Sequence, residues 1–465
     1  MYALDELCRD LGDIPHSLDP MTIRKKSRDR FAISPLLRQA LAGKSADIVV
    51  SPRNKAELIA VVQAAVRRRI PMTPRGGGTA NYGQSVPLHG GILLDMTQIS
   101  GVLWARDGRI RALAGTLMSE VDAVSRASGW ELRLHPSTRS HATIAGFVAG
   151  GSGGMGSCMW GMLRDRGNIT AMEVVSAEEE PRTIELRGRD VALPHHAYGT
   201  NAIITEIEMP ANPAWTWIEA IVAFPDYMQA ARFGIALTRE VSIVKKLVSL
   251  QEWPIPRLMR EFASIVPERH SMANCMVTEA TSEAFADMVV EFGGKIVARH
   301  KEGEGSYGLP LYEFAFGHGL LQVQKTNPKY TALQGLFPSE RLFEAIDRVH
   351  GRFAGQMPMR LEMMWSQGEI VAMGSPFIVF ESTEQMAGLV EVLQAEGVSV
   401  ANNHATGVRE VGIKQIDERD VAFKASMDPY NLLNPGKLDF AIETSATGKS
   451  SLPTVGWNFR KAVGN

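Results

Sequence analysis

The segment Pro74-Arg75-Gly76-Gly77-Gly78-Thr79-Ala80-Asn81 contains three consecutive glycines between polar residues. Three glycines in a row cost backbone entropy on folding, so a specific gain must offset that cost. Successive backbone amides in mixed left- and right-handed conformations form a concave nest that binds an anion. The segment lacks the GxxxxGK[ST] pattern of a P-loop, which argues against a nucleoside triphosphate. The sequence therefore predicts either a phosphate-binding loop or a tight turn between two strands.

A second glycine-rich segment begins about 60 residues further along the chain. It runs from Pro136 to Gly146 and continues through Gly150-Gly151-Ser152-Gly153-Gly154-Met155-Gly156, which contains a literal GxGxxG. A dinucleotide-binding turn of that pattern opens a helix, and Cys158-Met159-Trp160-Gly161-Met162 is a poor start for one. We therefore expect the two glycine-rich segments to grip opposite sides of one diphosphate.

The composition of the chain excludes several classes of protein. With 465 residues, it is too long for one ordinary core, so we expect two domains or one domain with a large insertion. The formal net charge is −2, which gives no global field to attract nucleic acid or an anionic membrane. The cysteines, Cys8, Cys158 and Cys275, exclude a disulfide scaffold and suit a reducing compartment. No run reaches the roughly 18 apolar residues of a membrane helix, so we expect a cytoplasmic protein.

Residues 46–210 alternate between strand and helix patterns. The predicted strands are residues 46–50, 70–74, 91–95 and 109–114, and the predicted helices are residues 55–69 and 119–128. Beyond about Pro210 the elements become longer and glycine loops become rare. There the predicted helices are residues 225–239 and 283–292, and the predicted strands are residues 311–323 and 360–380, with a turn at Gln367-Gly368. This order predicts an α+β fold with more than one sheet and a ferredoxin-like second domain.

Four segments, taken together and in order, resemble the motifs of the vanillyl-alcohol-oxidase (PCMH-type) FAD-binding flavoproteins. They are Pro74–Thr79, Pro136–Gly146, Gly199–Glu206 and Asp428–Lys437. The resemblance implies an α+β fold, in which a PCMH-type FAD-binding domain of two subdomains carries a ferredoxin-like α+β cap. It places the FAD-binding domain in residues 1–210 and the substrate or cap domain in residues 211–425. A C-terminal segment, residues 426–465, returns to the FAD-binding domain.

The resemblance implies FAD, with its pyrophosphate between the two glycine loops. Carried over by position, the cofactor-binding residues are Arg75, Gly76, Gly77, Gly78, Thr79, Ser137, Ser140, Thr143, Gly146, Gly150, Ile204 and Asn434. Some members of the family attach FAD covalently through a histidine of the first loop, and the loop here has none. Cys158 does not stand at the position of the cysteinyl linkage, so we expect non-covalent FAD and a small buried role for Cys158.

The resemblance also implies an FAD-dependent oxidoreductase that oxidises a C–OH group of a small 2-hydroxy acid-like substrate by hydride transfer to flavin N5. The hydroxyl proton needs a base, and histidine suits that role because its pKa lies near neutrality. The candidate bases are His318 and His404, each of which could equally be a structural histidine. Arg360 is the candidate partner for a substrate carboxylate, with Lys325 and Arg409 as further cations, although each could be solvated surface charge. We expect His195-His196 to be a surface pair.

No metal is expected at this site. In the D-lactate and D-2-hydroxyglutarate dehydrogenase branch, the motif E-H-G-x-G precedes the terminal motif, and His404 aligns with its histidine. Asn403 replaces the glutamate of that motif. The H-x-G-D-G-N metal motif of that branch corresponds to Gly368–Ser375, which contains no histidine.

Several alternatives stay open at this stage. The substrate could be a larger aromatic or phenolic alcohol, because Met and aromatic residues are frequent between residues 253 and 365. The protein could also bind FAD without turnover, or run as a reductase. In this family the residue at Ala114 of Ala114-Gly115 affects access of oxygen, and alanine favours a dehydrogenase over an oxidase. The electron acceptor could be O2, a quinone or an electron-transfer protein, and a homo-oligomer is compatible with the sequence.

Overall fold

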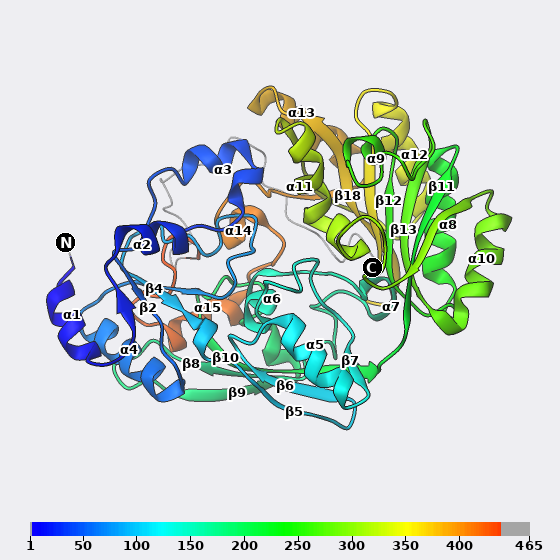
Figure 1. Cartoon of the computed structure of the whole chain (residues 1–465). Coiled ribbons are helices and arrows are strands. Elements are labelled where there is room, and N and C mark those ends of the chain that lie inside the picture. Colours follow the sequence, from blue (N-terminus) through cyan, green and yellow to red (C-terminus); the bar gives the residue numbers. More distant parts are fainter. Residues whose placement is uncertain (1, 439–465) are drawn as a thin grey trace.

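The computed structural model describes residues 2–438, so the predicted C-terminal segment beyond Leu438 lies outside the described residues. The described chain forms three sheets of four, six and nine strands (Figure 1). The two smaller sheets belong to the first part of the chain, and the nine-stranded sheet belongs to the cap. The predicted combination of helices with more than one sheet is confirmed.

The four-stranded sheet has a parallel centre. Its order is β1 (His16–Ser17), β2 (Ile48–Val50), β4 (Ile92–Asp95) and β3 (Met72–Arg75), with β2, β4 and β3 parallel. The flanking helices are α1 (Leu4–Leu11), α2 (Pro20–Lys26) and α4 (Lys55–Arg67), whereas α3 (Pro35–Ala40) packs in a separate cluster with Leu41 and Val86. Helix α4 turns Leu58, Val61 and Val62 into the core, where none is exposed. Because β3 ends at Arg75, the first glycine loop begins directly at the end of this strand.

The six-stranded sheet is antiparallel and packs against helices on one face only. Its order is β5 (Val102–Arg106), β6 (Arg109–Leu113), β10 (Ile203–Pro213), β8 (Ala171–Val175) and β9 (Thr183–Arg187), and β7 (Trp130–Leu132) also pairs with β10. Along β10, Ile207 and Met209 join a core with α5 (Met118–Ala127) and α6 (Ile144–Gly150). The alternate residues Glu206 and Glu208 face the other way.

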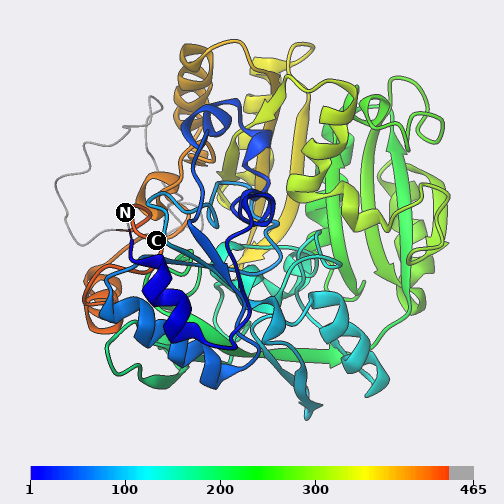
Figure 2. The same cartoon turned by 60° about the vertical axis from the view of Figure 1, so that its left-hand side comes forward.

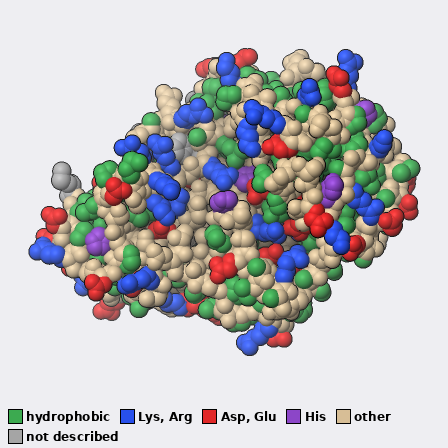
Figure 3. Space-filling view, viewed as in Figure 1, with side chains coloured by type: hydrophobic (Ala, Val, Ile, Leu, Met, Phe, Trp, Pro, Cys, Tyr) green, Lys and Arg blue, Asp and Glu red, His purple; other side chains and the backbone are tan. Residues whose placement is uncertain are grey.

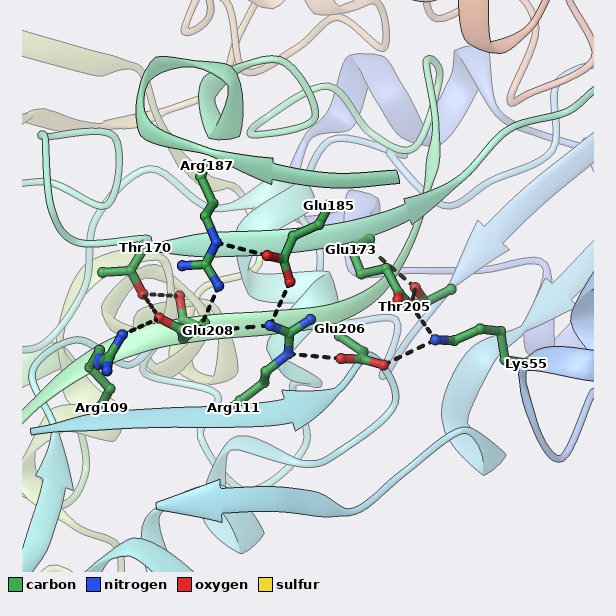
Figure 4. A network of polar contacts seen from close by, with 10 residues as sticks. All are labelled: Lys55, Arg109, Arg111, Thr170, Glu173, Glu185, Arg187, Thr205, Glu206 and Glu208. Atoms are coloured by element: carbon green, nitrogen blue, oxygen red, sulfur yellow. Dashed lines mark hydrogen bonds and ion pairs between the residues drawn. The ribbon is translucent and has the colours of Figure 1, made fainter. Parts of the chain in front are cut away.

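A network of ion pairs covers that other face (Figure 4). Arg111 of β6 donates to Glu206 Oε2 of the neighbouring β10 at 2.8 Å and, across β8, to Glu185 Oε2 of β9 at 2.7 Å. Lys55 of α4 lies 3.1 Å from Glu206 Oε1, so the network also ties the four-stranded sheet to the six-stranded one. The two sheets are therefore held together on the side opposite the glycine loops.

The cap contains two ferredoxin-like units that form one antiparallel sheet. The first unit is β11 (Trp217–Phe224), α8 (Tyr227–Arg239), β12 (Lys245–Gln251), β13 (Ser271–Thr278), α10 (Ser282–Glu291) and β14 (Lys295–Lys301). The second is β16 (Gln334–Phe337), α12 (Leu342–Phe353), β17 (Met359–Ser366), β18 (Glu369–Val379), α13 (Thr383–Ala395) and β19 (Ser399–Ala401). Both follow the strand–helix–strand order twice, and β12 pairs with β17 to join them. The predicted ferredoxin-like cap is confirmed.

The two faces of the cap sheet differ in what covers them. Helices α8, α10, α12 and α13 share one core with the sheet. On the opposite face lie α9 (Ile255–Leu258), the turn η5 (Leu311–Phe314) and α11 (Phe316–Thr326). The short strand β15 (Tyr330–Ala332) pairs with β18 beside α11.

Two local predictions are wrong. Residues 311–323 form η5 and α11 instead of a strand, because their apolar positions Leu311, Phe314, Leu320 and Val323 all face one core at a spacing that a helix can satisfy. His195 and His196 are buried instead of forming a surface pair, because Nδ1 of His196 bonds the Gly151 carbonyl at 2.9 Å and the chain around them is enclosed.

The GxGxxG segment does not open a dinucleotide-binding helix. Gly156 has a φ of +89°, and the helix after it, α7 (Ser157–Trp160), ends after one turn at Gly161. The expectation that Gly151, Gly153 and Gly156 belong to the second glycine loop agrees with this geometry. The pair β17 and β18, with its turn at Gln367-Gly368, forms as predicted.

The chain returns from the cap to the first part through α14 (Val408–Val411) and α15 (Glu418–Met427). Figure 2 shows α15 beside the N-terminal elements, and Lys424 Nζ donates to the Thr200 carbonyl at 2.7 Å. The domain limits at residues 210 and 425 stay a prediction, and these contacts place α15 with the first part. Among the described residues, no helix is long and apolar enough to cross a membrane.

A buried ionic cluster fastens the cap to the first part. Glu302, at the end of β14, lies 3.1 Å from Arg139 of the second glycine segment and 2.9 Å from Lys246 of β12. Burial raises the pKa of Glu302, but the two cations outweigh it and bring the pKa to about 2. Glu131 of β7 accepts from Trp217 Nε1 of the cap at 3.0 Å. These contacts fix the cap above the glycine loops.

We expect Asp428→Ala to lower the free energy of unfolding by about 3–5 kcal/mol, measured by urea denaturation, because it removes the acidic half of a buried ion pair. Asp428 is fully buried, pairs with Lys424 at 3.1 Å, and accepts from the backbone N–H groups of Leu432 and Leu433. Glu418→Ala, at an exposed position of the same helix, is the control and should stay within about 0.5 kcal/mol of the wild type. Equal losses in the two variants would contradict the assigned role.

Candidate active site

Two cavities meet along the glycine loops. The glycine-loop cavity runs between β3, α6 and the start of β10, and the cap cavity lies between the same loops and the cap. The residues that line both cavities are Thr79, Ala80, Gln84, Gly146 and Gly150. The two cavities are therefore parts of one continuous cleft.

The two glycine loops touch so closely that side chains would not fit between them. A Cβ atom on Gly76 would lie 2.0 Å from Thr143 Oγ1, and one on Gly77 would lie 1.9 Å from the His141 carbonyl oxygen. Gly78 has a φ of +66°, which favours glycine. The absence of side chains leaves backbone N–H groups accessible along the cavity, as a bound diphosphate requires.

Gln84 fixes the junction of the two cavities. Its Nε2 donates to the Gly150 carbonyl at 3.0 Å, and its Oε1 accepts from the backbone N–H groups of Asn81 and Tyr82. The glycine-loop cavity also has apolar walls, among them Met96, Ala114, Ala202 and Ile204. Such walls suit a flat ring, and the backbone amides of the glycines suit a diphosphate.

Most of the predicted cofactor residues come together here. Those that line the glycine-loop cavity are Arg75, Gly76, Gly77, Gly78, Thr79, Thr143, Gly146, Gly150 and Ile204. Ser137 lines the cap cavity instead. Ser140 is exposed and bonds His141 Nδ1 at 2.8 Å. Asn434 is fully buried behind the wall and donates to the carbonyls of Gln84 and Tyr198, so its contact with the site passes through Gln84.

His318 faces the cap cavity from the first turn of α11. Its Nδ1 lies 2.6 Å from Glu313 Oε2, and its Nε2 contacts the Arg30 guanidinium. A carboxylate only accepts, so Nδ1 carries the proton and Nε2 is left as an acceptor. The imidazole is thus held in one tautomer and one orientation.

Arg360 of β17 lines the same cavity and is almost buried. Its NH1 donates to the Phe316 carbonyl and lies 3.5 Å from Glu362 Oε1. Burial lowers the pKa of Arg360, and Glu362 opposes that shift. Glu362 also accepts from the Phe316 backbone N–H at 2.7 Å, which holds Phe316 at a φ of +52° where α11 begins. Arg360 and Glu362 therefore set the start of the helix that carries His318.

His404 lies behind the cavity wall. It is 5% exposed and does not line the cap cavity, whereas its neighbour Asn403 does. Its Nδ1 bonds Ser34 Oγ at 2.7 Å, and burial lowers its pKa to about 4. The structure brings His318 and Arg360 together and leaves His404 apart from them.

Some residues that line the cap cavity, and two that contact His318 without lining it, Glu313 and Arg30, carried no signal in the sequence. Tyr82 donates to Gln334 Oε1 inside the cavity, and burial raises the pKa of Tyr82. Glu313 stands five residues before His318, a spacing that no motif marks, and Arg30 lies in an N-terminal segment without a pattern. An apolar wall completes the cavity with Ile33, Phe316, Leu320, Met373 and Phe377.

The remaining candidates lie elsewhere. Lys325 and Arg409 do not line either cavity; the Lys325 side chain is exposed and 3.8 Å from Glu261. Cys158 is buried in the cap core, as predicted, and burial raises its pKa to about 12. Within residues 2–438, no group of three or more His, Cys, Asp or Glu side chains could hold a metal ion.

Comparisons with known proteins identify the cofactor. Residues 46–185 match a family model described as FAD binding domain. The chain is 22% identical to the glycolate oxidase subunit GlcD of Bacillus subtilis (strain 168) over 425 residues, 84% of this chain and 88% of that protein. It is 26% identical to the D-lactate dehydrogenase of Archaeoglobus fulgidus over 205 residues, 42% of this chain and 45% of that protein.

A match over a shorter stretch of the chain and a match to a solved structure agree with these findings. The D-2-hydroxyglutarate dehydrogenase of Escherichia coli (strain K12) is 30% identical over 125 residues, 26% of this chain and 12% of that protein. A solved alkyldihydroxyacetonephosphate synthase matches with a TM-score of 0.70 and 15% identity, over 94% of this chain and 86% of its own. The predicted PCMH-type fold, FAD as cofactor and the class of FAD-dependent oxidoreductase are thus confirmed.

Gly146→Val should weaken FAD binding by about 1–3 kcal/mol, because its side chain would occupy space in both cavities. A Cβ there would lie 2.9 Å from Thr143 Oγ1, which is too close, so the Thr143 side chain must shift; circular dichroism of the variant checks that the fold survives. Flavin absorbance of the purified protein and titration of the apoprotein with FAD measure the effect.

Gly351→Ala is the control, since a Cβ at this position of α12 meets no heavy atom within 4 Å. It should bind FAD like the wild type. If Gly146→Val binds FAD with the same affinity as the wild type, Gly146 does not belong to the cofactor site.

Proposed function

We propose that this FAD-dependent oxidoreductase oxidises the C–OH group of a small 2-hydroxy acid. The observation that carries the proposal is the oriented His318, which faces the cap cavity beside the buried cation Arg360 and next to the glycine loops. The relatives named for glycolate, D-lactate and D-2-hydroxyglutarate support the same class of substrate. Bound FAD supplies the hydride acceptor, N5 of its flavin.

His318 acts as the base. Glu313 holds the proton on Nδ1, so Nε2 is the atom that takes the hydroxyl proton while the hydride leaves the same carbon. Glu313 also stabilises the imidazolium that results. Arg360 supplies positive charge to the cavity wall, which favours an anionic substrate in the cavity. His404, hydrogen-bonded to Ser34, keeps the wall in place.

The apolar wall favours a substrate with a side chain. Phe316, Met373 and Phe377 line the cavity that His318 faces, and glycolate would leave them uncovered. The same wall is the observation that favours the second candidate, a larger aromatic or phenolic alcohol.

We also propose that FAD is bound non-covalently, because the first loop has no histidine and Cys158 packs in the cap core. We propose that the enzyme is a dehydrogenase and not an oxidase, because alanine stands at position 114, which lines the glycine-loop cavity. The rates at which O2, a quinone and an electron-transfer protein reoxidise the reduced flavin distinguish the possible electron acceptors. The free thiols Cys8, Cys158 and Cys275 support a cytoplasmic location, and light scattering tests for a homo-oligomer.

His318→Gln should slow flavin reduction by about 10²–10⁴-fold with FAD still bound, because the reaction loses its base. Anaerobic stopped-flow absorbance with saturating substrate measures the rate. His404→Gln is the matched control, and it should change stability more than the reduction rate. The reverse pattern would make His404 the base.

Along the series glycolate, lactate, 2-hydroxybutyrate and 2-hydroxyvalerate, kcat/KM should rise about fourfold per added CH2. The reason is that burial of one CH2 group against the apolar wall contributes roughly 0.8 kcal/mol. Anaerobic reduction of the flavin gives the series. A flat series would exclude contact with the apolar wall. Faster reduction by aromatic alcohols than by any 2-hydroxy acid would favour the second candidate.

A further inference from the structure

A segment near the N-terminus contributes Ile33 to the wall of the cap cavity. Residues 28–34, which we call the strap, connect α2 to α3. The Arg30 backbone N–H donates to the Ala80 carbonyl at 2.7 Å, directly after the first glycine loop. Gln324 of α11 donates to the Ile33 carbonyl at 3.2 Å, and Ser34 bonds His404. The strap is therefore tied to the glycine loop, to α11 and to the chain before α14.

The strap brings one side chain to the reactive atom of the base. The Arg30 guanidinium contacts His318 Nε2, the acceptor that Glu313 leaves available. A lone pair that accepts from a guanidinium cannot take a proton from a substrate at the same time. In this arrangement the base is capped.

The two arginines of the site differ in what they bind. Arg360 is committed to the Phe316 carbonyl and the Glu362 carboxylate. Arg30 contacts an imidazole, which is a neutral acceptor. Burial lowers the pKa of the Arg30 guanidinium, and the nearby Glu313 carboxylate opposes that shift. A carboxylate brings a full negative charge and can accept two parallel N–H bonds from a guanidinium, whereas the imidazole offers one neutral lone pair, so an arriving carboxylate competes well for Arg30.

The spacing of the two groups matches one substrate class. In a 2-hydroxy acid, the carboxylate and the hydroxyl stand on adjacent carbons, so their partners must also be adjacent. Arg30 and His318 Nε2 are in contact. The last turn of α2 carries Arg24 and Lys25, and that of α3 carries Arg38. Figure 3 shows several Lys and Arg side chains on the face that carries α2 and α3, and positive charge there favours the approach of an anion.

We propose that Arg30 is the specificity residue of this site: it caps Nε2 of His318 until the carboxylate of a 2-hydroxy acid draws the guanidinium away. The inference rests on the proposed function. Once Nε2 is released, it takes the hydroxyl proton while the hydride passes to the bound flavin, and the alcohol carbon becomes a carbonyl. An alcohol without an adjacent carboxylate leaves the base capped.

The test compares Arg30→Ala with the wild type on lactate and on 1,2-propanediol, which has the same hydroxyl without the carboxylate. We expect kcat/KM for lactate to fall about 10–100-fold, mainly through KM, because a charge-assisted hydrogen bond is lost. Reduction by 1,2-propanediol should stay equal or rise, because the base is no longer capped. Added guanidinium ion should restore part of the activity on lactate.

Arg28→Ala is the matched control, since Arg28 is an exposed arginine of the same strap. It should behave as the wild type with both substrates. Equal losses on lactate and 1,2-propanediol in Arg30→Ala, or an unchanged kcat/KM for lactate, would overturn the inference.

Calorimetric titration with oxalate separates this inference from the proposed function. Arg30→Ala should bind oxalate about 10–100-fold more weakly than the wild type and Arg28→Ala. If the wild type binds oxalate through Arg30 but no 2-hydroxy acid reduces its flavin, the oxidation fails and the carboxylate site stands. If the flavin is reduced and oxalate affinity is unchanged in Arg30→Ala, Arg30 is not the specificity residue.

Discussion

The site depends on hydrogen bonds between β3, the strand that leads into the first glycine loop, and the C-terminal end of the described chain. Met72, the first residue of β3, donates to the Leu432 carbonyl at 2.7 Å and accepts from the Asn434 backbone N–H at 2.8 Å. The Asn434 side chain adds donors to the Gln84 and Tyr198 carbonyls, and Lys437 Nζ donates to the Gly83 carbonyl. All these groups are buried, so each lost bond costs the desolvation of its partner. The glycine loop therefore keeps its shape without side chains of its own.

The cap adds the chemistry that the glycine loops lack. Backbone amides can hold a diphosphate, but they cannot accept a proton at neutral pH. The second face of the cap sheet carries η5 and α11, and with them Glu313 and His318. The buried cluster of Glu302, Arg139 and Lys246 fixes this face against the second glycine segment. In the proposed function, cofactor binding and proton transfer thus reside on separate folding units that meet at one cleft.

The sequence predicted what depends on local backbone geometry. The glycines of both loops were recognisable because a Cβ at Gly76 or Gly77 would collide with the facing loop, and no other residue type fits. The helix of α11 was missed because a continuous apolar run satisfies both strand and helix periods. The contact of Arg30 with His318 joins residues 288 positions apart, and neither stands in a motif. His404 aligned with a family histidine, and only the tertiary structure reveals that it lies behind the wall.

The return of the chain to the first glycine loop also bears on how the protein matures. Both loops and the strand that ends the first part have left the ribosome long before Asp428–Lys437 is made, because synthesis proceeds from the N-terminus. Until that segment arrives, the Met72 backbone and the Gln84 carbonyl lack their final partners. The cleft therefore stays incomplete while the whole cap is synthesised, and its final shape waits for Asp428–Lys437.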